Sequence, residues 1–510
     1  MRNRRAHATG GIAITAVALS AITIAVSPAN AAPTGPPLPS SGCINDIPAP
    51  PASSANPGQP QPPSIDITVP YAKLVPVPVP GPPDINRRIR PQPAPKNHCV
   101  DPCPDLTDVP PPPPAPDPTI FGLPLPKINI APQPFVVVPI PYPSTLFPQN
   151  APLPPTMHPG AAPAPVTRPP AVPKVSGLTD VAQVTGQGST SRTDKRWQVN
   201  GTDLGITWET KPGQIAIAFG DSVGKGFHPP GGVGGDYRSN LLGFSSNHDL
   251  SKGIKIDTMV QDSRCHAAQV ISSRKVQNWE VTTIPTSGFA LGKRQFMSYM
   301  SVRRWGSPGS WQTNYGGLAY SDDAGSTWIK DPYLRWDNIF GNSNFQVSAM
   351  VPQGDYVYMF GTPNGRMGAT ALARVPKAHV LNKTAYQYWS NGTWVPVPCT
   401  VLCVPDNPLN TTYNATPIFS GPTGELSMRY DSQRRIWQAS YLDPAVNAIV
   451  LRESTTPQGL WTRPVTLMSG TQYPGLYGGF MHPWSSARDL YFTMTQWQNY
   501  NVELMRVHLG

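Results

Sequence analysis

Proline is concentrated in one part of this chain, and its distribution limits what can fold. Of the 67 prolines in 510 residues, 46 lie in the 141 residues between Pro33 and Pro173. Each proline removes a backbone donor and blocks a helix or a central strand, so no packed core is expected at that density. We predict that residues 32–175 form a disordered or polyproline II arm and that residues 176–510 hold the folded domain. The arm could cross a thick cell envelope or could serve only as a tether.

The first 31 residues have the pattern of an export signal. Arginines at positions 2, 4 and 5 precede an uncharged stretch at residues 10–26, which is followed by Ala29-Asn30-Ala31. A basic start, a short apolar stretch and an A-x-A site predict a signal peptide cleaved after Ala31. An uncleaved anchor is the alternative, although the apolar stretch is at the short end of the spanning range. We therefore expect a secreted or envelope-associated protein with no membrane span after cleavage.

The six cysteines and the charges exclude several classes of site. Three cysteines lie in the arm and three in the folded part (Cys43, Cys99 and Cys103; Cys265, Cys399 and Cys403). We expect Cys399 and Cys403 to close a local loop, because a second pair for a zinc site is missing. The net charge of +10 is spread along the chain, which argues against a nucleic-acid partner. No metal-ligand cluster, phosphate loop or nucleophile elbow is present, so neither a metal nor a cofactor is expected.

Short alternating segments after residue 177 predict an all-β fold. Turn residues punctuate these segments, and no helical periodicity replaces them. The predicted strands are 205–209, 214–219, 295–303, 316–321, 346–351, 356–361, 371–375, 426–430, 436–442, 448–453, 489–496 and 502–508. Evenly spaced short strands without crossover helices indicate a sandwich, a barrel or a propeller.

An Asp-box decides among these three folds. Residues 321–328 read SDDAGSTW, which fits the S-x-D-x-G-x-T-W pattern found between outer strands of propeller blades. In that motif the aspartate, here Asp323, hydrogen-bonds the turn and the tryptophan, here Trp328, packs between sheets, so its role is structural. A looser copy occurs at residues 454–461. Two such turns predict repeated blades, and about five fit the length of the domain.

Two aspartates are the candidate catalytic residues. Residues 202–222 form a hairpin by their turn chemistry, and a turn centred on Pro212 places Asp203 directly across from Asp221. Two carboxylates at such a short distance repel each other, which raises the pKa of one of them. A protonated acid beside an ionised carboxylate suits glycosidic cleavage. A register slip of one residue would separate them, and either aspartate could instead be a turn or cap residue.

Further polar residues occur at predicted strand ends and are candidates for binding a substrate. They are Asp262, Asn364, Arg366, Glu425, His482 and Tyr477. Each of them could line the centre of a propeller, and each could equally satisfy backbone groups at a blade end.

Four ordered motifs carry a resemblance to a known family. They are residues 201–206 (GTDLGI), 219–222 (FGDS), 356–366 (YVYMFGTPNGR) and 477–483 (YGGFMHP). In these motifs the chain resembles exported actinobacterial endo-D-arabinanases (endo-D-arabinofuranases), glycoside hydrolases formerly described only as a domain of unknown function. The resemblance covers residues 176–510 and none of the arm.

The resemblance implies a five-bladed propeller that cleaves internal D-arabinofuranosidic bonds of mycobacterial-type arabinogalactan and lipoarabinomannan. It places the acid and base at Asp203 and Asp221 and leaves open which is which. The expected partner is this cell-wall polysaccharide. A non-catalytic propeller that binds envelope glycan or protein is the rival hypothesis, because a fold alone does not decide function.

Overall fold

The computed structural model describes residues 169–306, 309–338, 341, 343–396 and 415–510, and four strands within the arm. In the arm, β1 (Ser64–Pro80) pairs in parallel with β4 (Lys127–Ser144), and β2 (Thr119–Ile120) pairs with β3 (Leu123–Pro124). The predicted signal peptide and the expected Cys399–Cys403 loop lie outside the described residues. Cys265 is buried with a free thiol.

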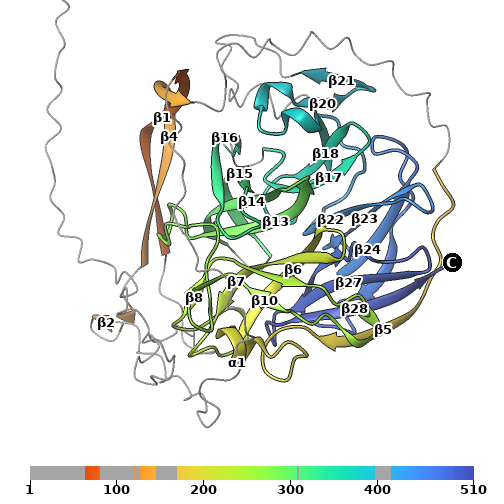
Figure 1. Ribbon diagram of the computed structural model, residues 1–510. Coiled ribbons are helices and arrows are strands. Elements are labelled where there is room, and N and C mark those ends of the chain that lie inside the picture. The colour runs from red at the N-terminus through yellow and green to blue at the C-terminus, as the bar shows by residue number, and fades with distance from the viewer. Residues whose placement is uncertain are drawn as a thin grey trace, which may run out of the picture. The chain divides into compact units, whose positions relative to one another are not determined.

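From Val175 onward, the described residues form five antiparallel sheets arranged as the blades of a propeller, which confirms the predicted fold (Figure 1). Blade 1 contains β6 (Gly201–Lys211), β7 (Gln214–Val223), β8 (Tyr237–Arg238), β9 (Leu241–Ser245) and β10 (Thr258–Met259). Blade 2 contains β13 (Thr282–Leu291), β14 (Arg294–Trp305), β15 (Trp311–Ser321) and β16 (Ile329–Asp337). Blade 3 contains β17 (Val347–Gln353), β18 (Tyr356–Thr362), β19 (Ala371–Pro376), β20 (Gln387–Ser390) and β21 (Thr393–Pro396).

The last two blades complete the ring. Blade 4 contains β22 (Leu426–Asp431), β23 (Ile436–Asp443), β24 (Ala448–Ser454) and β25 (Val465–Ser469). Blade 5 contains β26 (Leu476–Met481), β27 (Asp489–Gln496), β28 (Val502–Leu509) and β5 (Val175–Gln183). From Val175 onward, the described residues outside the blade strands also form one short α-helix, α1 (Thr193–Trp197), three 3₁₀ turns at residues 250–252, 377–379 and 383–385, and the strand pair β11 (Gln261–Ser263) and β12 (His266–Ala267).

Strand β5 joins the two ends of the folded domain. It precedes every other strand of the propeller but pairs with β28, the last one, as the outer strand of blade 5. The pairing continues to the chain end, where Lys174 and Gly510 exchange two backbone hydrogen bonds. Figure 1 marks the C-terminus beside this strand. Closure by the N-terminal strand leaves no gap between blades 1 and 5.

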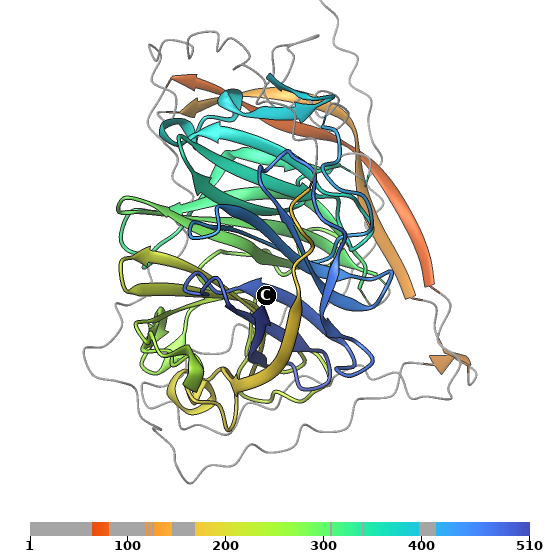
Figure 2. The ribbon, with the colours of Figure 1, turned by 90° about the vertical axis from the view of Figure 1, so that its right-hand side faces the viewer.

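The inner strands form a continuous ring that sets the direction of every blade. Strands β6, β13, β17, β22 and β26 each contact the next one, and β26 contacts β6. Their starts gather at one end of the propeller together with the ends of the second strands, since each blade is antiparallel. Tyr477 at the start of β26, for example, bonds Asp203 at the start of β6. We call this end the site face; Figure 2 shows the blades from the side.

Aromatic residues fill the space between neighbouring blades. Phe360 of blade 3 packs on Trp437 and Trp461 of blade 4, with ring centroids 5.6 and 6.3 Å apart. All three side chains are buried. Contacts of this kind hold flat sheets face to face, because each blade exposes apolar side chains on both surfaces.

The Asp-box forms the predicted turn between β15 and β16. Asp323 accepts hydrogen bonds from the backbone N of Thr327 at 2.8 Å and from its hydroxyl at 2.5 Å. The indole of Trp328 is buried and donates to the carbonyl of Gly325 at 3.0 Å. The motif is structural, as expected. Among the described residues, no helix is both long and apolar enough to cross a membrane.

Candidate active site

A β-bulge at the start of blade 1 orients the first candidate aspartate. Strands β6 and β7 pair in the predicted register at Thr202–Ser222 and again at Ile206–Ala218. Between these points Leu204 pairs with Phe219 and has a positive φ of 71°. Asp203 therefore lies in an irregular segment, and the expected direct pairing with Asp221 is not formed. A bulge of this kind turns a side chain out of the ladder, which is common beside active sites.

Asp203 is buried with one carboxylate oxygen bonded and the other free. Its Oδ2 accepts hydrogen bonds from the hydroxyls of Tyr477 at 3.0 Å and Tyr500 at 3.2 Å. Its Oδ1 is buried and has no hydrogen-bond partner among the described residues. Burial and the charge of Asp221 raise the pKa of Asp203 well above its usual value, despite the two tyrosine bonds. Burial thus favours the protonated form of Asp203, and an ionised Asp221 favours it further.

Asp221 lies near the end of β7, in a more polar setting. Its Oδ1 accepts hydrogen bonds from the Tyr237 hydroxyl at 2.6 Å and the Thr282 hydroxyl at 2.5 Å. Burial raises its pKa to about 6, and these two bonds together with the charge of Lys275 limit the rise. Near neutral pH this carboxylate is mostly ionised. The two environments thus favour different protonation states, which is the arrangement that acid-base cleavage of an acetal requires.

An ion pair stands beside Asp203. Arg366 donates to Oε1 of Glu425 from Nε at 3.0 Å and from Nη2 at 2.6 Å. Oε2 of Glu425 is buried without a partner among the described residues. The Arg366 guanidinium also lies 5.5 Å from the ring centre of Tyr477 and 5.7 Å from that of Trp311. The structure thus brings three of the sequence-predicted binding residues, Arg366, Glu425 and Tyr477, to the catalytic candidates.

Two other predicted residues are at blade ends in different surroundings. The side-chain oxygen of Asn364 accepts from the side-chain amide of Asn338 and from the Thr313 hydroxyl at 3.4 Å. Asn364 therefore ties blade 3 to blade 2. Asp262 is half exposed and lies 2.6 Å from Nδ1 of His266, and no hydrogen bond links it to Asp203 or Asp221 in the described part of the chain.

The structure separates His482 from the aspartates. It follows the end of β26, whereas Tyr477 and Asp203 are at the start of their strands. Its neighbour Trp484 donates to Glu209 at 3.2 Å, near the far end of β6. Glu209 is six positions along the strand from Asp203, a distance of about 20 Å. The His482 ring is fully buried, and burial lowers its pKa to about 3. His482 is therefore a neutral side chain at the end of the propeller opposite the site face.

Several site residues were not identified from the sequence. Tyr237, Thr282 and Tyr500 hold the two carboxylates, and they come from blades 1, 2 and 5. Each stands in an ordinary turn or strand segment. Tyr237 is on the strand that pairs with β7 and Thr282 is in the next blade, whereas Tyr500 reaches Asp203 only because the ring closes. No group of three or more metal-ligating side chains occurs among the described residues.

Comparison with known proteins places the folded domain in a family. The model of the domain of unknown function DUF4185 matches residues 188–506, which is more than half of the chain. The chain belongs to the DUF4185 family. The match spans the propeller from the segment before α1 to β28, and therefore includes both aspartates and the ion pair beside them.

The DUF4185 domain has relatives in fungi. Notoamide biosynthesis cluster protein J of an Aspergillus species is 30% identical over 334 residues, covering 61% of this chain and 83% of that protein. Notoamide biosynthesis cluster protein J' of Aspergillus versicolor is 30% identical over 333 residues, covering 61% of this chain and 84% of that protein.

The solved structures that this chain matches have low sequence identity to it. The catalytic domain of the Coprinopsis cinerea GH62 α-L-arabinofuranosidase is 8% identical with a TM-score of 0.37, covering 66% of this chain and 96% of that chain. The GH43_1 enzyme of Xanthomonas citri is 13% identical with a TM-score of 0.36, covering 61% of this chain and 88% of that chain.

Proposed function

We propose that this protein is a glycoside hydrolase in which Asp203 and Asp221 form the catalytic pair. The observation that carries the proposal is the difference in environment between the two carboxyl groups. Asp203 is buried with a free Oδ1, and Asp221 is held at Oδ1 by two hydroxyls near Lys275. Glycosidic cleavage needs one carboxyl group that can donate a proton and one that is charged.

The two environments support a different role for each aspartate. Asp203 is the general acid, because burial and the charge of Asp221 keep it protonated. Among the described residues its Oδ1 has no hydrogen-bond partner, so this is the oxygen that would give its proton to the glycosidic oxygen. It is buried against Gly220, so the substrate must displace its present neighbours to reach it. Asp221 is the ionised partner, and its charge stabilises the positive character that develops on the sugar ring. Arg366 and Glu425 supply hydrogen-bonding groups beside Asp203 for sugar hydroxyls.

The substrate proposed is the D-arabinan of mycobacterial-type cell walls, in arabinogalactan or lipoarabinomannan, cleaved at internal bonds. The motifs at residues 201–206, 219–222, 356–366 and 477–483, which resemble endo-D-arabinanases, support this choice. The predicted signal peptide supports export to the compartment where such polymers occur. An exported protein with a long proline-rich segment would meet its substrate outside the membrane.

The direct test measures release of oligosaccharides. The purified protein is incubated with mycobacterial arabinogalactan, with L-arabinan as a control polymer, and the products are separated by chromatography. We expect oligosaccharides from arabinogalactan alone, and a loss of at least about 100-fold in Asp203→Asn and Asp221→Asn. Asp249→Asn is the matched control, because Asp249 is exposed on blade 1 and should leave activity unchanged.

The same experiment separates the enzyme from the rival hypothesis of a binding propeller. A binding protein would retain the intact polymer and release nothing from it. Full activity in both aspartate variants would show that the catalytic assignment is wrong. Activity on L-arabinan but not on arabinogalactan would keep the hydrolase and reject the D-arabinan substrate.

A further inference from the structure

Three tryptophans are exposed in the propeller, and all three lie on the site face. The exposed fractions are 55% for Trp279, 44% for Trp305 and 50% for Trp497. The chain has 13 tryptophans, all within the described residues, and the other ten are buried or half-buried. An exposed indole leaves a large apolar surface in water, so three on one face indicate a binding surface.

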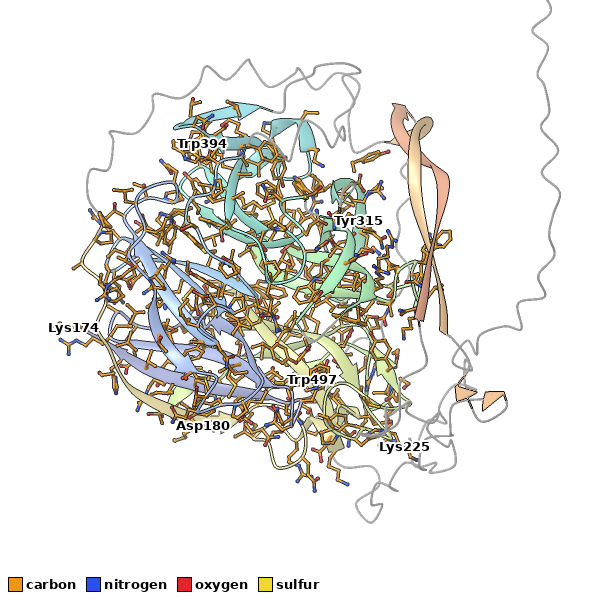
Figure 3. All side chains as sticks on the ribbon, turned by 180° about the vertical axis from the view of Figure 1, so that it is seen from behind. Lys174, Asp180, Lys225, Tyr315, Trp394 and Trp497 are labelled. Atoms are coloured by element: carbon orange, nitrogen blue, oxygen red, sulfur yellow. The ribbon has the colours of Figure 1, made fainter. Side chains whose placement is uncertain are left out.

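Trp497 lies on the Asp203 side of the catalytic pair. It follows the end of β27 and contacts Tyr500 edge to face, with ring centroids 5.8 Å apart. Tyr500 in turn donates to Oδ2 of Asp203. The Trp497 ring also covers Gly231, where a Cβ would stand 2.4 Å from the indole. The indole is thus held by neighbours on one side and exposed on the other; Figure 3 labels it.

Trp279 lies on the Asp221 side. It is three residues before Thr282, whose hydroxyl donates to Oδ1 of Asp221. Its backbone carbonyl accepts a hydrogen bond from the side chain of Asn314 at 2.7 Å, and its backbone N–H donates to the carbonyl of Val276 at 3.1 Å. These bonds fix the loop that carries the ring, so little conformational freedom is lost when a ligand stacks on it.

Trp305 extends the same face beyond the ion pair. It ends β14 and meets the buried Trp311 edge to face at 6.2 Å. Trp311 lies under the guanidinium of Arg366, which contacts Tyr477 beside Asp203. Chains of side-chain contacts therefore join Trp305 and Trp497 to the catalytic pair, whereas Trp279 is linked to it through the backbone that leads to Thr282.

We infer that Trp279, Trp305 and Trp497 are stacking platforms for sugar rings of a polysaccharide that crosses the aspartate pair. This inference rests on the proposed function. The C–H face of a sugar ring packs on an indole, while its hydroxyls need polar partners such as Arg366 and Glu425. Platforms on both sides of the carboxylates hold the chain on both sides of the bond that is cut. The site therefore binds internal segments of a polymer rather than a chain end.

The test compares binding and cleavage in alanine variants of the three tryptophans. Binding of arabinogalactan is measured by affinity electrophoresis in the Asp221→Asn background, where cleavage does not interfere. We expect Trp279→Ala and Trp497→Ala each to weaken binding about tenfold. Phenylalanine at the same positions should restore most of it, because the ring is retained. Melting temperatures check that each variant is folded.

Leu460 supplies the matched control. It is 48% exposed, on the turn after β24 at the opposite end of the propeller, so Leu460→Ala removes exposed apolar surface without touching the site face. We expect it to bind as the parent does. In the active protein, the tryptophan variants should raise KM for the polymer far more than for an oligosaccharide of a few residues.

The outcomes keep the two proposals apart. If the tryptophan variants bind the polymer as well as Leu460→Ala does, the platforms are refuted, even when the aspartate variants are inactive. If no polymer is cleaved but the tryptophan variants still weaken binding, the platforms stand and the hydrolase is refuted. Release of a single small product by the parent protein, in place of mixed oligosaccharides, would also overturn the inference, because it would mean binding at chain ends.

Discussion

The Cα of Gly220 lies directly against the carboxylate of Asp203. A Cβ at position 220 would stand 2.3 Å from Oδ1 of Asp203, the free oxygen of the proposed acid. Gly220 does not have a positive φ, so alanine fits its backbone. The Asp203 carboxylate must move, and the Leu204 side chain, 3.0 Å from the new Cβ, must shift slightly. We expect Gly220→Ala to fold but to lose about 100-fold in kcat, measured as oligosaccharide release, because a displacement of about 1 Å has that effect.

Gly510→Ala is the control for this substitution. Its new Cβ would be 3.8 Å from the nearest atom, an ordinary contact far from the site. Its activity and melting temperature should match the parent. A Gly220→Ala variant with full activity would show that Oδ1 of Asp203 does not need its present position.

Much of the fold could be predicted because its signals are local. All twelve predicted strands coincide with strands, and the Pro212-Gly213 turn gave the β6–β7 hairpin. Strand β13 was missed, since its Thr, Ser and Pro residues do not alternate with apolar ones. Strand β5 was missed for a different reason, because it borders the proline-rich segment and pairs with β28 at the far end of the chain.

The site could be predicted only where it is local to one hairpin. Asp203 and Asp221 lie on paired strands, so turn chemistry alone placed them near each other. The bulge at Leu204 has no clear signal, because a leucine with positive φ is rare. Tyr500 approaches Asp203 from a loop 297 positions away, and this contact depends on ring closure. His482 was grouped with the site because its motif also holds Tyr477, although the two lie at opposite ends of β26.

The pH dependence of cleavage follows from the two aspartates. Asp221 must be ionised and its pKa is about 6, so kcat/KM should rise as the pH passes through about 6. Asp203 must be protonated and its pKa is raised well above the usual value, so activity should fall again at higher pH. Initial rates on arabinogalactan from pH 4 to 9 test this. A profile without a rise through about pH 6 would exclude Asp221 as the ionised partner.

Lys275 provides a specific test of the acidic limb of the pH profile, which is the rise in kcat/KM near pH 6. Its Nζ donates to the carbonyl of Tyr237 at 2.8 Å, and its charge lowers the pKa of Asp221. Without this charge the Asp221 carboxylate is less stable, so Lys275→Met should move the acidic limb to higher pH. Lys275→Arg keeps the charge and should leave the limb in place. A uniform loss of rate without a shift would mean that Lys275 only supports the loop.

Asp203→Asn should stabilise the protein while it removes activity. The pKa of Asp203 is higher in the folded protein than in the unfolded chain, where it is about 3.8. The folded state is therefore most stable below about pH 3.8, and this contribution to stability is lost as the pH rises. Asparagine stays neutral, and its oxygen can still accept from Tyr477 and Tyr500. We expect a higher melting temperature than the parent at pH 8 and no difference near pH 3.5. Asp249→Asn, at an exposed site, should not show this gain.

The pairing of β28 with β5, which closes the ring and is called the seam here, should also be weaker at high pH. Glu503 on β28 pairs with Gln183 of β5, and burial together with the charge of Asp180 raises its pKa to about 7. Protonation of Glu503 therefore stabilises the seam at low pH, and this contribution is lost as pH rises through about 7. Glu503→Gln should raise the melting temperature at pH 8.5 but not at pH 4, measured by calorimetry. Asp180→Asn should act in the same direction, because it removes the second charge; a lower melting temperature in both variants at pH 8.5 would contradict repulsion at this seam.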